Sequence, residues 1–459
     1  MLGDVHSHWT SAAVIVLAAA LTASSSSHVA GSAQLKVPVK LTDPACNDGR
    51  GLLVPQSSSE SDLESIFVRT TVLSDRVVLV GTSSAGTSAP RSRATFVIHA
   101  FTPRCTVDRS FGTDGVANIL LPPSTGKGTA SVSDWAPDGT GVVVVGSTST
   151  TGFAMRLTSD GRVDRSFGTK GVATLVTPHP SSAGSAADTV AVAPSGHVLV
   201  GADDGAALCC ASSYVADLEP GGSLDRSFGT GGWTSALTTG SRITQLAVQP
   251  GGTVLVAISD IETGEGNVSV DQLSPGGTPS TSFAAHFRAA MAQVDPGSYF
   301  AAELYPRPGG GFALMGTAAA SSAGEQPMDF VAAGFLADGS LDASYGTGGT
   351  TQLAEVDGND VAAVALTGGS VVFVDEPWIA PRSPLYEPAG TLRLTYLTSR
   401  GVLNTSLVAG GVVLVPDQQL VAISQGGFDT YELDAVAEGD AVRVVAVTPK
   451  GLNVLGLRG

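Results

Sequence analysis

The pattern Asp-x-Ser followed by an aromatic residue and a glycine recurs at four places and is the first candidate for chemistry. The pairs are Asp108 with Ser110, Asp164 with Ser166, Asp225 with Ser227, and Asp342 with Ser344. Oxygen atoms at this spacing could bind calcium, or each carboxylate could accept backbone N–H groups and close a local turn. Calcium takes six to eight oxygens, and Lys170 and Gly231 replace the further carboxylate that Asp114 offers in the first copy. We therefore predict structural turns and no metal site.

The sequence contains no catalytic constellation that can be recognised from its motifs. Gly-x-Ser-x-Gly and His-Glu-x-x-His, which would indicate a serine hydrolase and a zinc enzyme, are both absent. His99, His179, His197 and His286 fall at unrelated points of the chain, which argues against a shared metal site. Carboxylates are plentiful, but their spacing singles out no pair. We expect no cofactor and assign no catalytic residue.

The Asp-x-Ser pairs belong to a ten-residue phrase that repeats along the chain. Its first copy spans 107–116, and three further copies begin at Val163, Leu224 and Leu341. Two eroded copies, 279–284 and 403–408, keep the spacing and lose the aspartate. We expect the phrase aromatics to fill gaps between successive units, and the glycine after each to adopt angles that other residues resist. The predicted structural residues are Asp108, Phe111, Gly112, Asp164, Phe167, Gly168, Asp225, Phe228, Gly229, Asp342, Tyr345 and Gly346.

A short apolar run, rich in β-branched residues, appears once in each unit. The runs are Val77–Val80, Val142–Val145, Val198–Val200, Val254–Val256, Phe312–Met315, Val371–Val374 and Leu420–Ile423. Such runs suit strands buried on both faces, and four short strands per unit are typical of a propeller blade. We predict an all-β fold over residues 34–459, a seven-bladed β-propeller with four antiparallel strands per blade. Residues 43–49 resemble a shortened phrase, so we expect the strand at 52–55 to complete the last blade and close the ring.

The phrase Leu-Asp-x-Ser-Phe-Gly-x-x-Gly-Val, preceded by a Gly or Asp-Gly turn, resembles the delta-60 repeat of bacterial exported β-propeller proteins. The resemblance covers residues 43–453 and is specific for the fold, because four near-identical copies lie at propeller spacing. It implies a bacterial protein that is secreted or associated with the cell envelope. It supplies no catalytic residue.

Residues 1–33 are interpreted as a signal peptide. The apolar run 11–23 is too short to span a bilayer comfortably, and small residues follow it. We expect no transmembrane anchor. An exported protein can keep disulfides, and Cys46, Cys105, Cys209 and Cys210 allow three pairings. The pairing of Cys46 with Cys105 is the first to test, because it would tie the N-terminal segment to the first repeat.

The net charge and the composition of the loops limit the partners that we expect. A formal net charge of −17 argues against nucleic acid and anionic membranes, which need clustered Lys and Arg. The connections between second and third strands vary, and the richest, 375–387, carries Trp378, Arg382 and Tyr386. These residue types dominate binding hot spots, although a loop folded over its own blade is the alternative. We predict a monomeric binding or scaffold module for a protein or glycan of the cell envelope. The alternative is an envelope lyase or hydrolase acting on a glycan or peptide at the central funnel.

Overall fold

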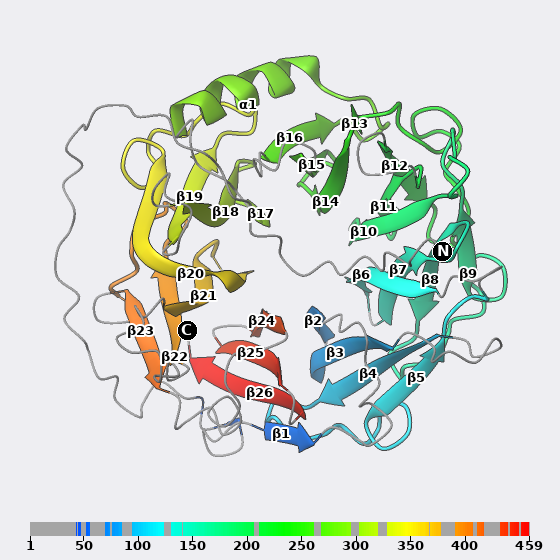
Figure 1. Cartoon of the computed structure of the whole chain (residues 1–459), viewed down its shortest axis with the longest axis horizontal. Coiled ribbons are helices and arrows are strands. Elements are labelled where there is room, and N and C mark those ends of the chain that lie inside the picture. Colours follow the sequence, from blue (N-terminus) through cyan, green and yellow to red (C-terminus); the bar gives the residue numbers. More distant parts are fainter. Residues whose placement is uncertain are drawn as a thin grey trace, which may run out of the picture.

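The structure is a computed structural model, in which antiparallel sheets stand around a common centre (Figure 1). It describes residues 43, 45–46, 52–55, 69–73, 76–84, 94–123, 130–139, 141–205, 211–260, 268–294, 303–319, 328–366, 368–377, 391–406, 411–416, 432–438, 441–448 and 451–458. The expected signal peptide lies outside these residues, as do Cys209 and Cys210. Within the described residues, no helix has the length and apolar character that crossing a membrane requires.

Three four-stranded sheets follow one another in the first half of the chain. Each is a meander, in which strands adjacent in sequence are hydrogen-bonded neighbours. The strands are β2 (Arg69–Leu73), β3 (Arg76–Ser84), β4 (Thr95–Phe101), β5 (Val116–Leu120), β6 (Ser131–Asp138), β7 (Gly141–Ser147), β8 (Gly152–Leu157), β9 (Val172–Leu175), β10 (Ala186–Val192), β11 (Val198–Asp203), β12 (Ser212–Leu218) and β13 (Thr238–Thr239). In Figure 1 the first strand of each sheet lies nearest to the centre.

The β-branched runs form strands, as the sequence predicts. Six of the seven runs lie in β3, β7, β11, β15 (Val254–Asp260), β18 (Phe312–Ala319) and β21 (Val371–Pro377). Every residue of β11 is buried, because sheets pack on both of its faces. The seventh run, Leu420–Ile423, lies outside the described residues.

The next sheet departs from the expectation of four strands. Its described strands are β14 (Ser241–Val248), β15 and β16 (Val268–Leu273), and the helix α1 (Thr281–Val294) follows where a fourth strand was predicted. The cause lies in the eroded phrase 279–284, because Ala284 stands where the intact copies carry a glycine at positive φ. Without that glycine the left-handed turn is disfavoured, and an Ala-rich segment continues as helix. Phe283, Phe287 and Ala290 are buried and form its packing face.

A seven-stranded sheet comes after α1 and is built around one long strand. Its strands are β17 (Glu303–Pro306), β18, β19 (Met328–Phe335), β20 (Thr350–Ala365), β21, β22 (Thr391–Leu397) and β23 (Val412–Pro416). The first part of β20, from Thr350 to Val356, pairs with β19. Its second part, from Val361 to Ala365, pairs with β21, and Val356 also opposes Pro377 at the end of β21. One continuous strand therefore serves two groups of strands.

The last sheet joins the two ends of the chain. It contains β24 (Glu432–Glu438), β25 (Ala441–Thr448), β26 (Gly451–Arg458) and the N-terminal β1 (Leu52–Pro55). β1 pairs antiparallel with β26, with Leu52 opposite Val454. β25 is the second strand of this sheet, so the seventh apolar run, Leu420–Ile423, does not supply it.

Candidate functional site

The repeated aspartates close local turns. Oδ1 of Asp164 accepts hydrogen bonds from the backbone N–H (2.9 Å) and the hydroxyl (2.6 Å) of Ser166. The same pair of bonds is made at Asp108, Asp225 and Asp342. Asn404 of an eroded copy holds Ser406 in the same way. Oδ1 of each of these side chains is thus used within the turn, which is the structural alternative to a calcium loop.

Each phrase aromatic is buried beneath a turn of the next repeat. The exposed fraction is 1% for Phe111, 0% for Phe167, 2% for Phe228 and 1% for Tyr345. A Cβ added to Gly222 would lie 3.0 Å from the ring of Phe167, and one added to Gly161 would lie 2.6 Å from that of Phe111. Ring and glycine therefore fit together at the boundary between successive repeats, a contact that we call the joint.

A backbone hydrogen bond accompanies the aromatic at every intact joint. The N–H of Gly168 donates to the carbonyl of Gly221 in the next repeat (2.7 Å). Gly112, Gly229 and Gly346 make the corresponding bonds to Asp160 (3.0 Å), Gly276 (2.9 Å) and Arg400 (2.7 Å). These four glycines have φ between +51° and +55°, a region that a side chain disfavours. The phrase is therefore a coupling device between repeats.

Arginines reinforce three joints, and the repeated phrase itself does not indicate them. Arg156 of β8 bonds Asp164 (2.8 Å) and donates to the carbonyl of Pro220 in the next repeat (2.7 Å). Arg307, from the turn between β17 and β18, contacts Asp342 (2.9 Å) and the carbonyl of Ser399 (3.1 Å). Arg156 stands eight residues before Asp164, a spacing visible in the sequence. Arg307 precedes its aspartate by 35 residues, so only the fold could reveal it.

The third arginine binds the N-terminal segment. Arg443 of β25 is 2% exposed and bonds Asp43 (2.7 Å) and the carbonyl of Pro103 (3.0 Å). Asp43 in turn accepts the backbone N–H of Ala45 (3.0 Å), as the other phrase aspartates do with their serines. A disulfide joins Cys46 to Cys105, with 4.7 Å between their Cα atoms. Both chain ends therefore meet at one joint.

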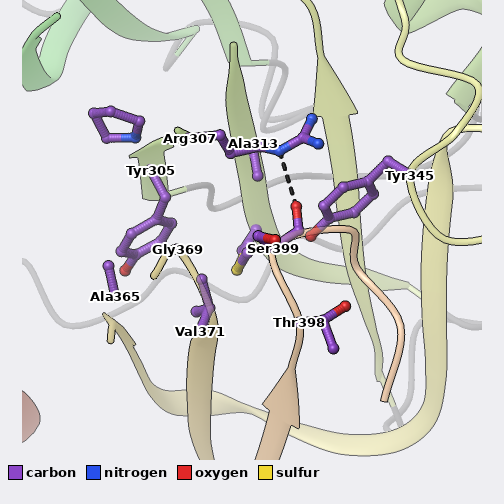
Figure 2. Close-up of a pocket in the computed structure, with 11 residues that line it drawn as sticks. Tyr305, Arg307, Ala313, Tyr345, Ala365, Gly369, Val371, Thr398 and Ser399 are labelled. Carbon is purple, nitrogen blue, oxygen red and sulfur yellow. Dashed lines mark hydrogen bonds between the residues drawn. The ribbon is translucent and has the colours of Figure 1, made fainter. Parts of the chain in front are cut away.

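Figure 2 shows a small cavity at the joint that holds Tyr345. Arg307 reaches across it to Ser399, and its guanidinium carbon lies 5.0 Å from the centre of the Tyr345 ring. The volume of about 10 Å³ corresponds to about one water molecule, far below the size of ordinary ligand pockets. Burial raises the pKa of Tyr345 to about 12, so the phenol is neutral at physiological pH. The cavity belongs to the packing of the joint.

The opposite end of the sheets carries a buried cluster of charge. Asp188 lies at a bulge in β10, Asp203 ends β11, and Arg242 lies near the start of β14. Asp203 has none of its surface exposed, and its Oδ2 lies 3.3 Å from Nε of Arg242. Its Oδ1 accepts the N–H of Gly205 (2.7 Å). The register places this cluster where the variable connection 204–211 begins.

One carboxyl group of this cluster, that of Asp188, has a raised pKa. Burial and the adjacent charge of Asp203 raise the pKa of Asp188 to about 8. Oδ2 of each side chain is buried and accepts no hydrogen bond, and the Arg242 ion pair is the positive charge beside Asp203. A carboxyl group that holds its proton near neutral pH can act as a general acid.

Sequence spacing gave no sign of this pair. Asp188 and Asp203 are brought together by strand pairing, in which Ala186 opposes Asp203. The residues that the sequence did single out on this side, Trp378, Arg382 and Tyr386, lie outside the described residues.

Comparison with known proteins gives structural likeness only. No protein-family profile matches the sequence, and no curated protein matches it. A Trypanosoma rangeli sialidase in complex with the inhibitor DANA aligns at a TM-score of 0.40 and 10% identity, over 86% of this chain and 55% of that chain. A subtype N10 neuraminidase-like protein of A/little yellow-shouldered bat/Guatemala/060/2010 gives 0.40 and 12%, over 89% and 98%.

A PQQ-bound aldose sugar dehydrogenase from Streptomyces coelicolor gives a TM-score of 0.34 and 12% identity, over 74% of this chain and 99% of that chain. This chain therefore spans about half of the sialidase chain and nearly all of the other two. At these values the likenesses identify no binding or reacting residue here.

Proposed function

We propose that the chain is an exported binding module built on a seven-bladed β-propeller of delta-60 type. Division of β20 between β19 and β21 makes two blades of the seven-stranded sheet. Together with the five other sheets of the described residues, this division supports the proposed number of seven units. The disulfide between Cys46 and Cys105 supports export, because such bonds persist in oxidising compartments.

Pairing of the chain ends supports a closed ring. β1 adds to β26 as the outer strand of the last sheet. The inner strand of that sheet, β24, contacts β20 on one side and β2 on the other. Closure would protect the sheet edges that an open array exposes.

The observation that carries the binding proposal is the difference between the two ends of the sheets. The connections between first and second strands are short and alike, as at 193–197, 249–253 and 307–311, and the joints lie at this end. The connections at the other end differ widely, as at 148–151, 204–211 and 378–390. Function tends to occupy variable loops held by a rigid frame. We therefore place the binding face at the variable end.

Trp378, Arg382 and Tyr386 of the longest of these connections are the proposed contacts, and a glycan or protein of the cell envelope is the proposed partner. The test is co-sedimentation of the purified chain with bacterial cell-wall sacculi and, separately, with envelope membrane vesicles. We expect the wild type to sediment with one of the two. The Trp378→Ala/Tyr386→Ala variant should bind at least about 10-fold more weakly, as loss of hot-spot aromatics does.

Val402→Ala is the matched control, because Val402 is 53% exposed on a turn at the opposite end. Its binding should equal that of the wild type. No sedimentation of the wild type, or equal binding by the loop variant, would contradict the proposal.

The buried carboxyl pair favours a second candidate function, hydrolysis near the centre of the ring. Asp188 lies in β10, which borders that centre in Figure 1, and it holds a proton near neutral pH. Two carboxyl groups in contact are too close for the separations of about 5–9.5 Å used by glycosidases, and resemble a pair that activates one water. Asp203 is fully buried, so a substrate could meet the pair only through the half-buried Asp188. Because a substrate has so little access to the pair, hydrolysis is the second candidate and binding is the first.

Hydrolysis of a fluorogenic peptide panel and an ester panel tests this alternative. The alternative is supported if the wild type is active and if Asp188→Asn and Asp203→Asn each abolish that activity. Both variants must keep the circular dichroism spectrum of the wild type. Activity unchanged in both variants, or none in the wild type, would exclude the pair as a catalyst for these substrates.

A further inference from the structure

One joint is built differently from those that carry arginine. At the joint of β8, Arg156 stands eight residues before the phrase aspartate and bonds it. In the next repeat the residue eight before Asp225 is Asp217, a second carboxylate in place of the cation. The register confirms the equivalence, since Arg156 opposes Val143 as Asp217 opposes Leu199.

A histidine faces these two carboxylates. His197 closes the turn between β10 and β11, and its Nδ1 lies 3.1 Å and 3.2 Å from the two carboxylate oxygens of Asp217. The same nitrogen lies 3.9 Å from Oδ2 of Asp225. One atom from each of the three side chains falls within 4.8 Å of the others. These atoms come from a turn, a strand end and the phrase, so the fold brings them together.

The charge of the cluster needs a cation. Arg156, Arg307 and Arg443 each supply a permanent positive charge to a phrase aspartate. Here two carboxylates share one imidazole, and Asp217 is only 6% exposed. Burial raises the pKa of Asp217, and the bond from His197 opposes that rise. A buried carboxylate without a permanent counter-charge is costly unless a proton or a metal ion compensates it.

We propose that His197, Asp217 and Asp225 together bind one divalent transition-metal ion, with zinc as the expected ion. An imidazole nitrogen beside carboxylate oxygens suits zinc and its neighbours, whereas calcium and magnesium prefer oxygen alone. Zinc bonds of about 2.0–2.1 Å in a tetrahedron set the ligand atoms about 3.3 Å apart. The observed separations of 3.1 Å and 3.9 Å lie on either side of this value.

The ion would keep an open coordination position and would replace the arginine as the link within the joint. The His197 and Asp225 side chains are 32% and 21% exposed, so water can reach the fourth position. The three ligands would tie the β10–β11 turn to the phrase. Bound metal should therefore stabilise the folded chain, since binding to the native state alone raises stability.

The test is metal titration of the demetallated full chain in a Cys209→Ser/Cys210→Ser background, which removes two thiols that could bind metal. Zn²⁺ is followed by calorimetry and Co²⁺ by its visible absorption. We expect one ion per chain and a rise in the melting temperature. His197→Ala should weaken binding by on the order of 100-fold or more, because losing a residue that only orients a ligand already costs about 10–100-fold. Asp225→Asn, at a more exposed position, should also weaken it.

His286→Ala is the matched control. His286 also faces an aspartate, with Nδ1 3.5 Å from Oδ2 of Asp338, but both groups are exposed and the described residues place no third ligand there. This variant should bind as the wild type does. The proposal is overturned if no saturable site is found, or if the affinity survives both His197→Ala and Asp225→Asn in folded protein. It is also overturned if acidification stabilises the chain through His197 while zinc has no effect, since a proton would then be the counter-charge.

Discussion

Cys46 stands where the other joints carry a buried aromatic ring, and its partner Cys105 stands where they carry a glycine. Cys46 follows Asp43 by three residues, and its N–H donates to the carbonyl of that aspartate (2.9 Å). Phe111 makes the same bond to Asp108 (3.1 Å). In the N-terminal phrase a cysteine therefore occupies the position that an aromatic residue holds in the other copies.

Cys105 occupies the matching place in the turn 102–106. Its N–H donates to the carbonyl of Thr102 (2.9 Å), as that of Gly161 does to Thr158 (2.9 Å). Its φ of +54° lies in the region that Gly161 adopts at +78°. A covalent bond thus replaces the contact between ring and glycine at the joint where the chain ends meet.

Removal of this disulfide should weaken the whole chain. The bond joins residues 59 apart, and the double variant Cys46→Ser/Cys105→Ser should lose about 3–4 kcal/mol of unfolding free energy. The reason is that the unfolded state gains freedom while the joint loses its link. Urea denaturation with and without a reductant measures the effect. The reductant should destabilise the wild type and leave the variant unchanged, and equal losses in both would contradict this account.

The turn glycines should tolerate substitution only where the neighbouring repeat leaves room. Gly222 has φ +83°, and its added Cβ would lie 2.6 Å from the backbone nitrogen of Gly168. Gly222→Ala should therefore cost about 2–4 kcal/mol, from the backbone strain and the clash together. The measurement is the urea midpoint.

Gly231→Lys provides the control. Gly231 has φ +66° with nothing within 4 Å of an added Cβ, and Lys170 occupies the same place in an earlier copy at φ +56°. Its stability should stay within about 1 kcal/mol of the wild type. A loss as large as that of Gly222→Ala would show that crowding at the joint is not the cause.

Arg156 should contribute to stability more than a nearby exposed arginine. Arg156→Ala removes bonds to Asp164 and to the carbonyl of Pro220, and we expect a loss of about 1–3 kcal/mol. Arg162, whose side chain is 81% exposed, pairs with Asp160, and Arg162→Ala should change stability by about 0.5 kcal/mol or less. Thermal unfolding of both variants makes the comparison. Equal effects would mean that Arg156 does not hold the joint.

The carboxyl pair predicts a stability that falls as the pH rises. The pKa of Asp188 is about 8 in the folded chain, above the usual value of 3.8, so the folded state binds more protons between these values. Its contribution is present at low pH and is lost as the pH rises through about 8. Asp188→Asn, which keeps a donor without a charge, should flatten this dependence. Urea midpoints at pH 5 and pH 8 test it, and the same slope in wild type and variant would contradict the raised pKa of Asp188.

The local sequence predicts the turn and the buried aromatic of each phrase. It does not predict every residue that the phrase contacts in the next repeat. The Asp–Ser turn and the buried aromatic follow from residues within ten positions, so they could be read from the chain. The repeat pattern does not predict the helix α1. Ala284 in place of a glycine and the apolar spacing of Phe283, Phe287 and Ala290 are the local features that indicate it. The repeat pattern predicts a strand there, but the helix propensity of the Ala-rich segment decides its structure.

The sequence by itself determined the repeating unit, its second strands and the residues of the joint, because turn chemistry and strand burial depend on near neighbours. Only the tertiary structure decided which distant groups compensate each charge. Arg443 meets Asp43 across 400 residues, and Asp188 meets Asp203 only through strand pairing and a bulge. The physical reason is that electrostatic partners are selected by distance in space, which the arrangement of the sheets sets and local patterns do not encode.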